Sequence, residues 1–128
     1  MINTEMENII MNLIVDAGSA KSYAMEAIRL AKDGDFEEAE ESLKNANLDL
    51  AKAHHTQTDL IQQAARGETI EINLFMVHAQ DHIMTAMLAK DLAAEIVDLH
   101  RSLREPAFGG TSKKACCGYE ANVQRKGD

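Results

Sequence analysis

The feature that most constrains this chain is the spacing of its apolar residues, which alternates between three and four without a proline before Pro106. Between residues 4 and 33 the spacing forms one uninterrupted row: Ile10, Leu13, Ala17, Ala20, Ala24, Ala27 and Ala31. A seven-residue repeat of this kind predicts an α-helix with one buried stripe. Because small residues dominate the row, a neighbouring helix can approach closely.

A second row of the same period follows Gly34, and Gln57 is its only polar member. The segments Thr4–Glu7 and Asp35–Glu38 both have the sequence of a capping box. Gly34 and Arg66-Gly67 mark the two helix ends, since glycine adopts the left-handed turn that follows many helices. The short connection between the helices predicts an antiparallel hairpin. The second row is Phe36, Ala39, Leu43, Ala46, Leu50, Ala53, Gln57, Leu60 and Ala64.

The third segment, from about Thr69 to Arg104, is apolar on nearly every side. Thr69 and Asn73 are both plausible caps for its start. It carries three rows, of which the first is Phe75, His78, His82, Thr85, Ala89, Leu92, Ile96 and Leu99. The others are Val77, Asp81, Met84 and Leu88, and Met76, Gln80, Ile83, Met87, Ala94 and Val97.

A helix that is apolar all round must be buried all round, and two partner helices each cover about one stripe. We therefore predict an all-α, antiparallel three-helix bundle, up-down-up, that assembles into an oligomer with the third helix at its core. A monomeric bundle with a functional groove is the alternative. The bundle occupies residues 1–104, and residues 105–128 form an unassigned, flexible tail without helical periodicity.

Composition excludes several classes of function. The net charge is −8, which argues against nucleic acid and anionic membranes as partners. No apolar run is long enough to cross a membrane, and the acidic N-terminus does not resemble a signal peptide. The adjacent Cys116 and Cys117 fit neither a disulfide framework nor a metal pair. We expect a cytoplasmic protein.

Chemistry-bearing side chains concentrate in the run from His78 to His82. On a helix His78, Asp81 and His82 occupy positions i, i+3 and i+4, which lie on neighbouring faces. Three interpretations stay open: histidines that are hydrogen-bonded in the core, a metal site, and a phosphoryl relay through His78. In the relay, His82 supplies a donor or a positive charge to phosphate oxygens.

Asp81 needs a separate explanation because it lies in an apolar row. At an oligomer axis its carboxylate would face its own copies, and like charges that close recruit a cation or raise their pKa values. A divalent ion held by three Asp81 carboxylates would satisfy them. The alternative is an Asp81 side chain bonded to Gln80 or to a nearby lysine.

The run from Val77 to Met84 closely resembles the signature of the lactose/cellobiose family of enzyme IIA in the bacterial sugar phosphotransferase system (PTS). Ile83 departs trivially, standing where many relatives have leucine. The resemblance covers residues 5 to about 104. Further matches are Ile14–Ala20, Gly34-Asp35-Phe36, Ala53-His54, Gln57-Thr58 and Leu60-Ile61.

The resemblance implies a trimer of three-helix subunits that carries phosphoryl groups. The protein HPr would phosphorylate Nε2 of His78, with Gln80 and His82 in supporting roles. His78 would then pass the group to a cysteine of a IIB component. The resemblance also implies a magnesium-type ion on the trimer axis, bound by Asp81 of each subunit. A membrane component would move the sugar, which this chain would not touch.

A rival hypothesis is an oligomeric helical module that binds metal through His78, Asp81 and His82. The remaining histidines are weaker candidates. We expect His54 to pack near the site, His55 to be solvated, and His100 to interact favourably with the end of its helix. The sequence does not specify which disaccharide is transported, so lactose, cellobiose and chitobiose remain open.

Overall fold

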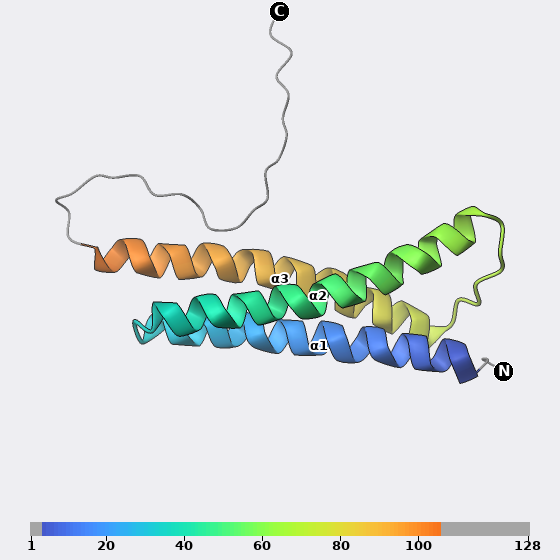
Figure 1. Ribbon diagram of the computed structural model, residues 1–128, viewed down its shortest axis with the longest axis horizontal. Coiled ribbons are helices and arrows are strands. Elements are labelled where there is room, and N and C mark those ends of the chain that lie inside the picture. The colour runs from blue at the N-terminus through green and yellow to red at the C-terminus, as the bar shows by residue number, and fades with distance from the viewer. Residues whose placement is uncertain (1–3, 106–128) are drawn as a thin grey trace, which may run out of the picture.

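The computed structural model describes residues 4–105, which form three α-helices. α1 spans Thr4–Lys32, α2 spans Phe36–Ala65 and α3 spans Leu74–Arg104. The chain runs up, down and up, so that α1 and α3 are parallel and α2 is antiparallel to both (Figure 1). The predicted all-α, three-helix architecture is confirmed for the single chain. The tail assigned to residues 105–128 lies, apart from Glu105, outside the described residues.

The core is made largely of alanines. All seven residues of the predicted α1 row are buried, from Ile10 to Ala31. On α2 the buried row runs from Ala39 to Leu60 and includes Gln57, as its period predicted. The prediction fails at Ala64, which is exposed because the last turns of α2 lean away from the other helices (Figure 1). Phe36, at the other end of the row, is only partly buried.

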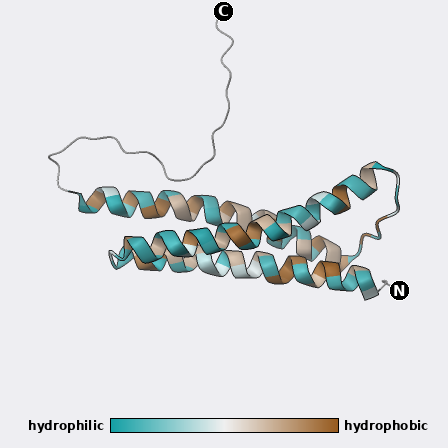
Figure 2. Ribbon diagram, viewed as in Figure 1, coloured by the Kyte–Doolittle hydropathy of each residue, from teal (hydrophilic) through white to brown (hydrophobic). Residues whose placement is uncertain are grey.

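Along α3 the structure buries one narrow row, which shares only Met76, Ile83 and Val97 with the third row that the sequence offered. Its members are Met76, Ala79, Ile83, Ala86, Ala93 and Val97. Figure 2 shows apolar residues interspersed with polar ones along every helix, so hydropathy alone does not pick out this face. The rows through His78 and through Asp81 are exposed or only partly buried in the single chain.

Both α1 and α2 end in a Schellman motif, a turn that satisfies the last carbonyl groups of a helix. After α1 the Asp35 N–H donates to the Leu30 carbonyl at 2.9 Å, and the Gly34 N–H donates to Ala31 at 3.1 Å. Gly34 and Gly67 adopt the required positive φ, each at 85°. The predicted capping box at Asp35 does not form: this N-cap residue makes no side-chain cap hydrogen bond. The Schellman turn that ends α1 instead holds the Asp35 backbone at φ −86° and ψ 67°.

The start of α3 is the later of the two that the sequence allowed. The helix begins at Leu74 rather than near Thr69, and Asn73 is the cap. Its side-chain Oδ1 accepts a hydrogen bond from the Met76 N–H at 3.0 Å. Residues 66–73 connect α2 to α3 without a helix or strand, and α3 begins directly after them.

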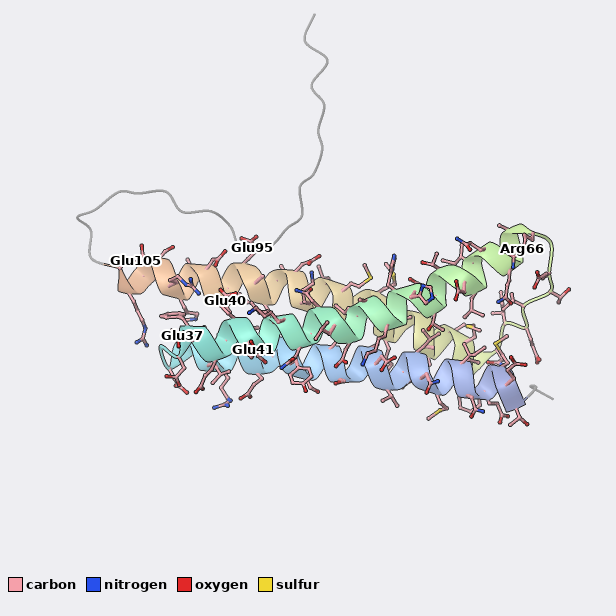
Figure 3. The ribbon with its side chains drawn as sticks, viewed as in Figure 1. Glu37, Glu40, Glu41, Arg66, Glu95 and Glu105 are labelled. Carbon is pink, nitrogen blue, oxygen red and sulfur yellow. The ribbon has the colours of Figure 1, made fainter. Side chains whose placement is uncertain are left out.

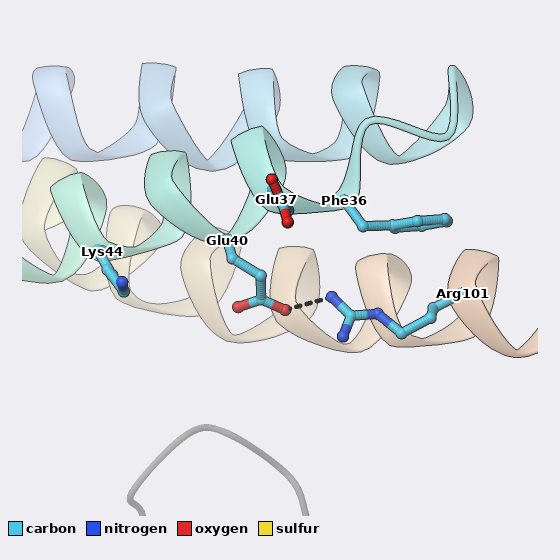
Figure 4. A pocket seen from close by; sticks show the side chains of 5 residues that line it. All are labelled: Phe36, Glu37, Glu40, Lys44 and Arg101. Carbon is cyan, nitrogen blue, oxygen red and sulfur yellow. Dashed lines mark hydrogen bonds and ion pairs between the residues drawn. The ribbon is translucent and has the colours of Figure 1, made fainter.

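At the end of the bundle near Gly34, arginines from α3 hold the helices together. The Arg101 guanidinium pairs with Glu40 at 2.8 Å and lies over the Phe36 ring at 5.4 Å, beside a hollow of about 490 Å³ (Figure 4). Arg104 donates to the Lys32 carbonyl at 2.8 Å. Glutamates from α2 and α3 gather near this end of the bundle (Figure 3), so Arg101 and Arg104 also offset negative charge there.

Candidate functional site

His78 lies near the start of α3, just beyond the turn that Asn73 caps. Its side chain is exposed, whereas His82, one turn later, is partly buried. The two imidazole rings meet edge to face, with centroids 4.5 Å apart and an angle of 75° between their planes. A regular helix places residues i and i+4 on one face, so the contact follows from the spacing in the sequence.

This arrangement suits a histidine that carries a group on its ring. An exposed imidazole can reach a partner, and neutral histidine is a nucleophile near neutral pH. The neighbouring ring of His82 limits the orientations that His78 adopts. When protonated, His82 also adds a positive charge close to whatever anionic group His78 carries.

Gln80 lies on a different side of the helix from His78. Two residues correspond to about 200° of rotation around an α-helix, so the side chains diverge. The Gln57 side chain of α2 donates from Nε2 to Oε1 of Gln80 at 2.6 Å, and it also lies 3.9 Å from the Met84 sulfur. Gln57 is only 6% exposed. Gln80 therefore marks the side of α3 that faces α2, and His78 lies on the opposite side.

The Gln57–Gln80 pair was missed from the sequence. The sequence did hold one signal: Gln57 is the single polar residue in the buried row of α2, and a buried amide must find a hydrogen-bond partner. Candidate partners were the polar residues of α3 at the same height in the bundle, and Gln80 is one of them. The contact matters because it fixes the orientation of a side chain close to His78 along α3.

Asp81 is exposed, and within residues 4–105 its carboxylate has no ion-pair partner. Neither the Gln80 amide nor a lysine satisfies it, so the alternative explanation of Asp81 receives no support in the single chain. Its backbone carbonyl accepts a hydrogen bond from the Thr85 hydroxyl at 2.8 Å. The carboxylate oxygens remain available as ligands for a hard cation.

A row of large apolar side chains surrounds Asp81 on the outer face of α3. We call this row, with Asp81 within it, the outer stripe of α3. These side chains are between 53% and 81% exposed, far more than a core residue. Residues 74, 81 and 88 are separated by seven, as are 92 and 99, which is the repeat of a coiled coil. The apolar members are Leu74, Val77, Met84, Leu88, Leu92 and Leu99.

No three acidic, histidine or cysteine side chains within residues 4–105 come close enough to hold a metal ion together. His78, Asp81 and His82 thus do not form such a set in one chain. The metal-binding module, as a function of one subunit, receives no support from this geometry. A shared site contributed by several copies is a separate matter, because it needs only one ligand from each chain.

An apolar groove of about 300 Å³ opens where α2 leans away from α3. It is lined by Leu60, Ile61, Ala64, Ile70, Ile72, Met76, Val77 and Gln80. The other histidines do not join His78. His54 is exposed on α2, His55 pairs with Asp59 on the same helix at 3.6 Å, and His100 lies in the last turns of α3.

Within residues 4–105 no helix combines the length and hydropathy needed to cross a membrane.

Comparison with known proteins agrees with this geometry. The sequence model of the lactose/cellobiose-specific IIA subunit of the PTS matches residues 8–101. The lichenan-specific phosphotransferase enzyme IIA component of Bacillus subtilis is 54% identical over 104 residues, covering 81% of this chain and 94% of that protein.

Solved structures extend the likeness to three dimensions. The cellobiose-specific enzyme IIA of Bacillus anthracis superposes with a TM-score of 0.77 at 48% identity, covering 80% of this chain and 94% of the other. A IIA protein of the chitobiose branch of the Escherichia coli phosphotransferase system, solved in complex with HPr, superposes with a TM-score of 0.69 at 39% identity, covering 80% and 100%. With its family signature, helices and exposed His78 all in agreement, this chain belongs to the lactose/cellobiose-specific IIA family of the phosphotransferase system.

Proposed function

We propose that this chain carries a phosphoryl group on His78, which it accepts from phosphorylated HPr and passes to a cysteine of a IIB component. Membership of the IIA family supports the phosphotransferase role, and a relative of known structure is bound to HPr. The observation that carries the assignment of the residue is the exposed His78 ring, oriented by the edge of His82.

Phosphoryl transfer requires the protein mainly to place the His78 ring where it can reach the donor and the acceptor. A ring nitrogen of His78, Nε2 in our proposal, attacks the phosphorus as the N–P bond of the donor breaks, and the donor imidazole keeps that electron pair. In the second step the sulfur of IIB attacks, and the N–P bond of His78 breaks in turn. A positive charge on His82 would stabilise the phosphoryl oxygens in both steps.

The experiment is labelling by phosphorylated HPr. The wild-type chain should take up one phosphate that is labile in acid and stable in base, and His78→Ala should take up none. His55→Ala is the matched control, since His55 is an exposed histidine on another helix. His82→Ala should still label, but more slowly. Full labelling of the His78→Ala variant would contradict the assignment.

The outer stripe of α3 supports a homotrimer with α3 at its centre. Exposed leucines with a seven-residue spacing bury one another in parallel coiled coils. The three Asp81 carboxylates would then meet on the threefold axis. Carboxylate oxygens are the preferred ligands of Mg²⁺, so one divalent ion per trimer, with water completing its shell, would satisfy them.

A threefold axis also gives Gln80 a role. Subunits around such an axis repeat in one rotational sense, so unlike flanks meet at each contact. The flank of α3 that carries His78 in one subunit would face the flank that carries Gln80 in the next. Gln80, held by Gln57, would therefore support the phosphoryl group of the adjacent subunit rather than its own.

Asp81→Leu tests the axial ion. The variant should lose the bound divalent ion, while the trimer is retained or becomes more stable, because three like charges at the axis disappear. Metal content and mass in solution are the measurements. Dissociation of the variant into monomers would contradict the axial site.

The transported sugar stays open among lactose, cellobiose and chitobiose, because the relatives above are named for different sugars. We place the protein in the cytoplasm, where phosphorylated HPr would reach it. The net charge of −8 favours a donor with a basic contact face.

A further inference from the structure

The hollow beside Arg101, at the Gly34 end of the bundle, opens between α2 and α3 (Figure 4). Its volume is about 490 Å³ and its wall is mostly apolar. An aromatic ring with a guanidinium above it offers a further aromatic side chain a place to pack. The lining residues are Phe36, Glu37, Glu40 and Lys44 from α2, and Arg101 from α3.

Arg101 carries a polar atom that lacks a partner within residues 4–105. Its Nη2 donates to Glu40 at 2.8 Å, but its Nε is buried and finds no hydrogen-bond acceptor among these residues. A buried donor without an acceptor is unfavourable, because it has lost its bond to water and gained nothing in return. An occupant that fits the hollow therefore brings an acceptor, such as a backbone carbonyl group, together with an apolar side chain.

The rim of the hollow is acidic. Glu37 is exposed and forms no ion pair within the described part of the chain. Glu41, Glu95 and Glu105 lie around the same end of the bundle (Figure 3). This negative charge favours an occupant that is positively charged beside its apolar part.

The segment that follows α3 has this chemistry. Residues 106–128 hold four basic and two acidic side chains, whereas acidic side chains outnumber basic ones in the residues before them. Phe108 is the first large apolar side chain after the helix, and the pair Lys113-Lys114 follows it closely. Aromatic and basic side chains thus come in the order in which the hollow and its rim could receive them.

The chain leaves α3 beside the hollow. Arg101 and Glu105 are one helical turn apart, which is about 6 Å along the axis. Glu105 has an extended backbone, at φ −73° and ψ 134°, as expected of a residue that precedes a proline. Phe108 follows three residues later, and three extended residues span at most about 11 Å. Phe108 can therefore reach the hollow without the chain crossing the bundle.

We propose that the hollow between α2 and α3 is the docking site of residues 106–114 of the same chain. Phe108 packs against the Phe36 ring, and a carbonyl group near it accepts the hydrogen bond of the Arg101 Nε. The pair Lys113-Lys114 lies over the acidic rim. The docked segment holds the last turns of α3 against the start of α2 and offsets the negative charge that gathers there.

Association between copies of the chain uses a different side of α3. Leu99 and Leu103 are each two residues away from Arg101, which corresponds to about 200° of rotation around the helix. These leucines are 59% and 72% exposed. A trimer built on the outer stripe of α3 therefore leaves the hollow open to a segment of its own chain.

A spin label on Cys116 tests the proposal in the full chain. The chain has two cysteines, so Cys117→Ser leaves a single site for the label. Amide signals of residues 36–44 should broaden when the label is oxidised and recover when it is reduced. Signals of residues 54–62, at the other end of α2, should not change. Equal broadening along all of α2, or none at residues 36–44, would overturn the proposal.

Substitutions in the segment and in the hollow identify the contacts. Phe108→Ser should remove most of the broadening at residues 36–44, whereas Tyr119→Ser, which changes an aromatic residue beyond the docked part, should leave it unchanged. Glu37→Lys should reduce the broadening. Glu38→Lys is its matched control, since Glu38 is exposed but does not line the hollow. Broadening that survives both Phe108→Ser and Glu37→Lys would show that the segment does not dock there.

A mixed sample distinguishes the chain's own segment from that of a second copy. Isotope-labelled chains without the spin label are refolded together with spin-labelled chains of natural isotope abundance. Broadening at residues 36–44 should then be much weaker than within one chain, because each hollow holds its own segment. Broadening of equal strength would overturn the proposal and assign the hollow to the segment of another copy.

Discussion

At the Gly34 end of the bundle, all three helices are held by specific contacts, whereas at the His78 end α2 leans away from its neighbours (Figure 1). Arg101 and Arg104 join the last turns of α3 to α2 and to the end of α1. The His78 end offers exposed apolar surface and a groove of about 300 Å³ instead. Interhelical contacts of arginine side chains thus concentrate at the Gly34 end, and exposed apolar surface lies around His78, the proposed phosphoryl carrier.

We expect the largest effect, a loss of stability, from Ala27→Leu. Ala27 is fully buried in a row of alanines, and a larger side chain there must separate α1 from the other helices. Overpacking of this kind should lower the free energy of unfolding by about 3 kcal/mol. Chemical denaturation measures it, with Ala51→Leu on the exposed face of α2 as the control. Equal stability of the two variants would mean that the helices are not closely packed.

Gly34→Ala should have the next largest effect. Alanine at a φ of 85° costs about 1–2 kcal/mol, and its Cβ would also displace the Arg104 guanidinium from the Lys32 carbonyl. Gly67→Ala is a matched control, since that residue has the same φ and nothing within 4 Å of the added atom. The difference between the two variants in thermal or urea unfolding measures the Arg104 contact, and equal losses would show that it contributes nothing.

Gln57→Leu should separate stability from function. The change removes the hydrogen bond to Gln80 but keeps an apolar stem in the core, so stability should change by about 1 kcal/mol or less. Phosphoryl transfer from HPr should slow several-fold, because Gln80 loses its fixed orientation. Ser42→Ala provides the comparison at the other end, where it removes a bond to the Tyr23 carbonyl. Slower phosphoryl transfer in Ser42→Ala would contradict the proposed separation between the Gly34 end and the His78 end of the bundle.

The smallest effect is expected from Gly18→Ala. An added methyl group meets nothing within 4 Å, and alanine favours the helix, so the free energy of unfolding should rise by about 0.5–1 kcal/mol. Calorimetry on the two proteins gives the difference. A loss of stability would show that the helix backbone near Gly18 is already in contact with another subunit.

The sequence predicted the buried face of α1 completely and that of α3 poorly, for one physical reason. A single apolar row has only one orientation that buries it, so Leu13 and its companions could be placed from spacing alone. α3 is apolar on several sides, and no local rule decides which side faces its own chain. Ala79, Ala86 and Ala93 were missed for that reason, although their spacing of seven matches the small residues of α1.

The contacts of the candidate site were also predicted only in part. The contact of His78 with His82 follows from local helix geometry, so its spacing was sufficient. The bond between Gln57 and Gln80 joins residues that are 23 positions apart and depends on how two helices are rotated against each other. The sequence predicted the row of Val77, Asp81, Met84 and Leu88 as a surface for other copies of the chain. The structure leaves this row exposed, and the association itself stays a prediction because a single chain does not specify it.

The buried alanines of α1 have a consequence for how this molecule works. A leucine or methionine core must freeze many side-chain rotamers on folding, whereas alanine has none to freeze. The alanine positions of the core therefore have no alternative rotamers into which they can switch. We expect the arrangement of α1 and its neighbours to change little when His78 carries a phosphoryl group. Successive partners would meet nearly the same shape, which suits a carrier that must hand over its cargo without resetting itself.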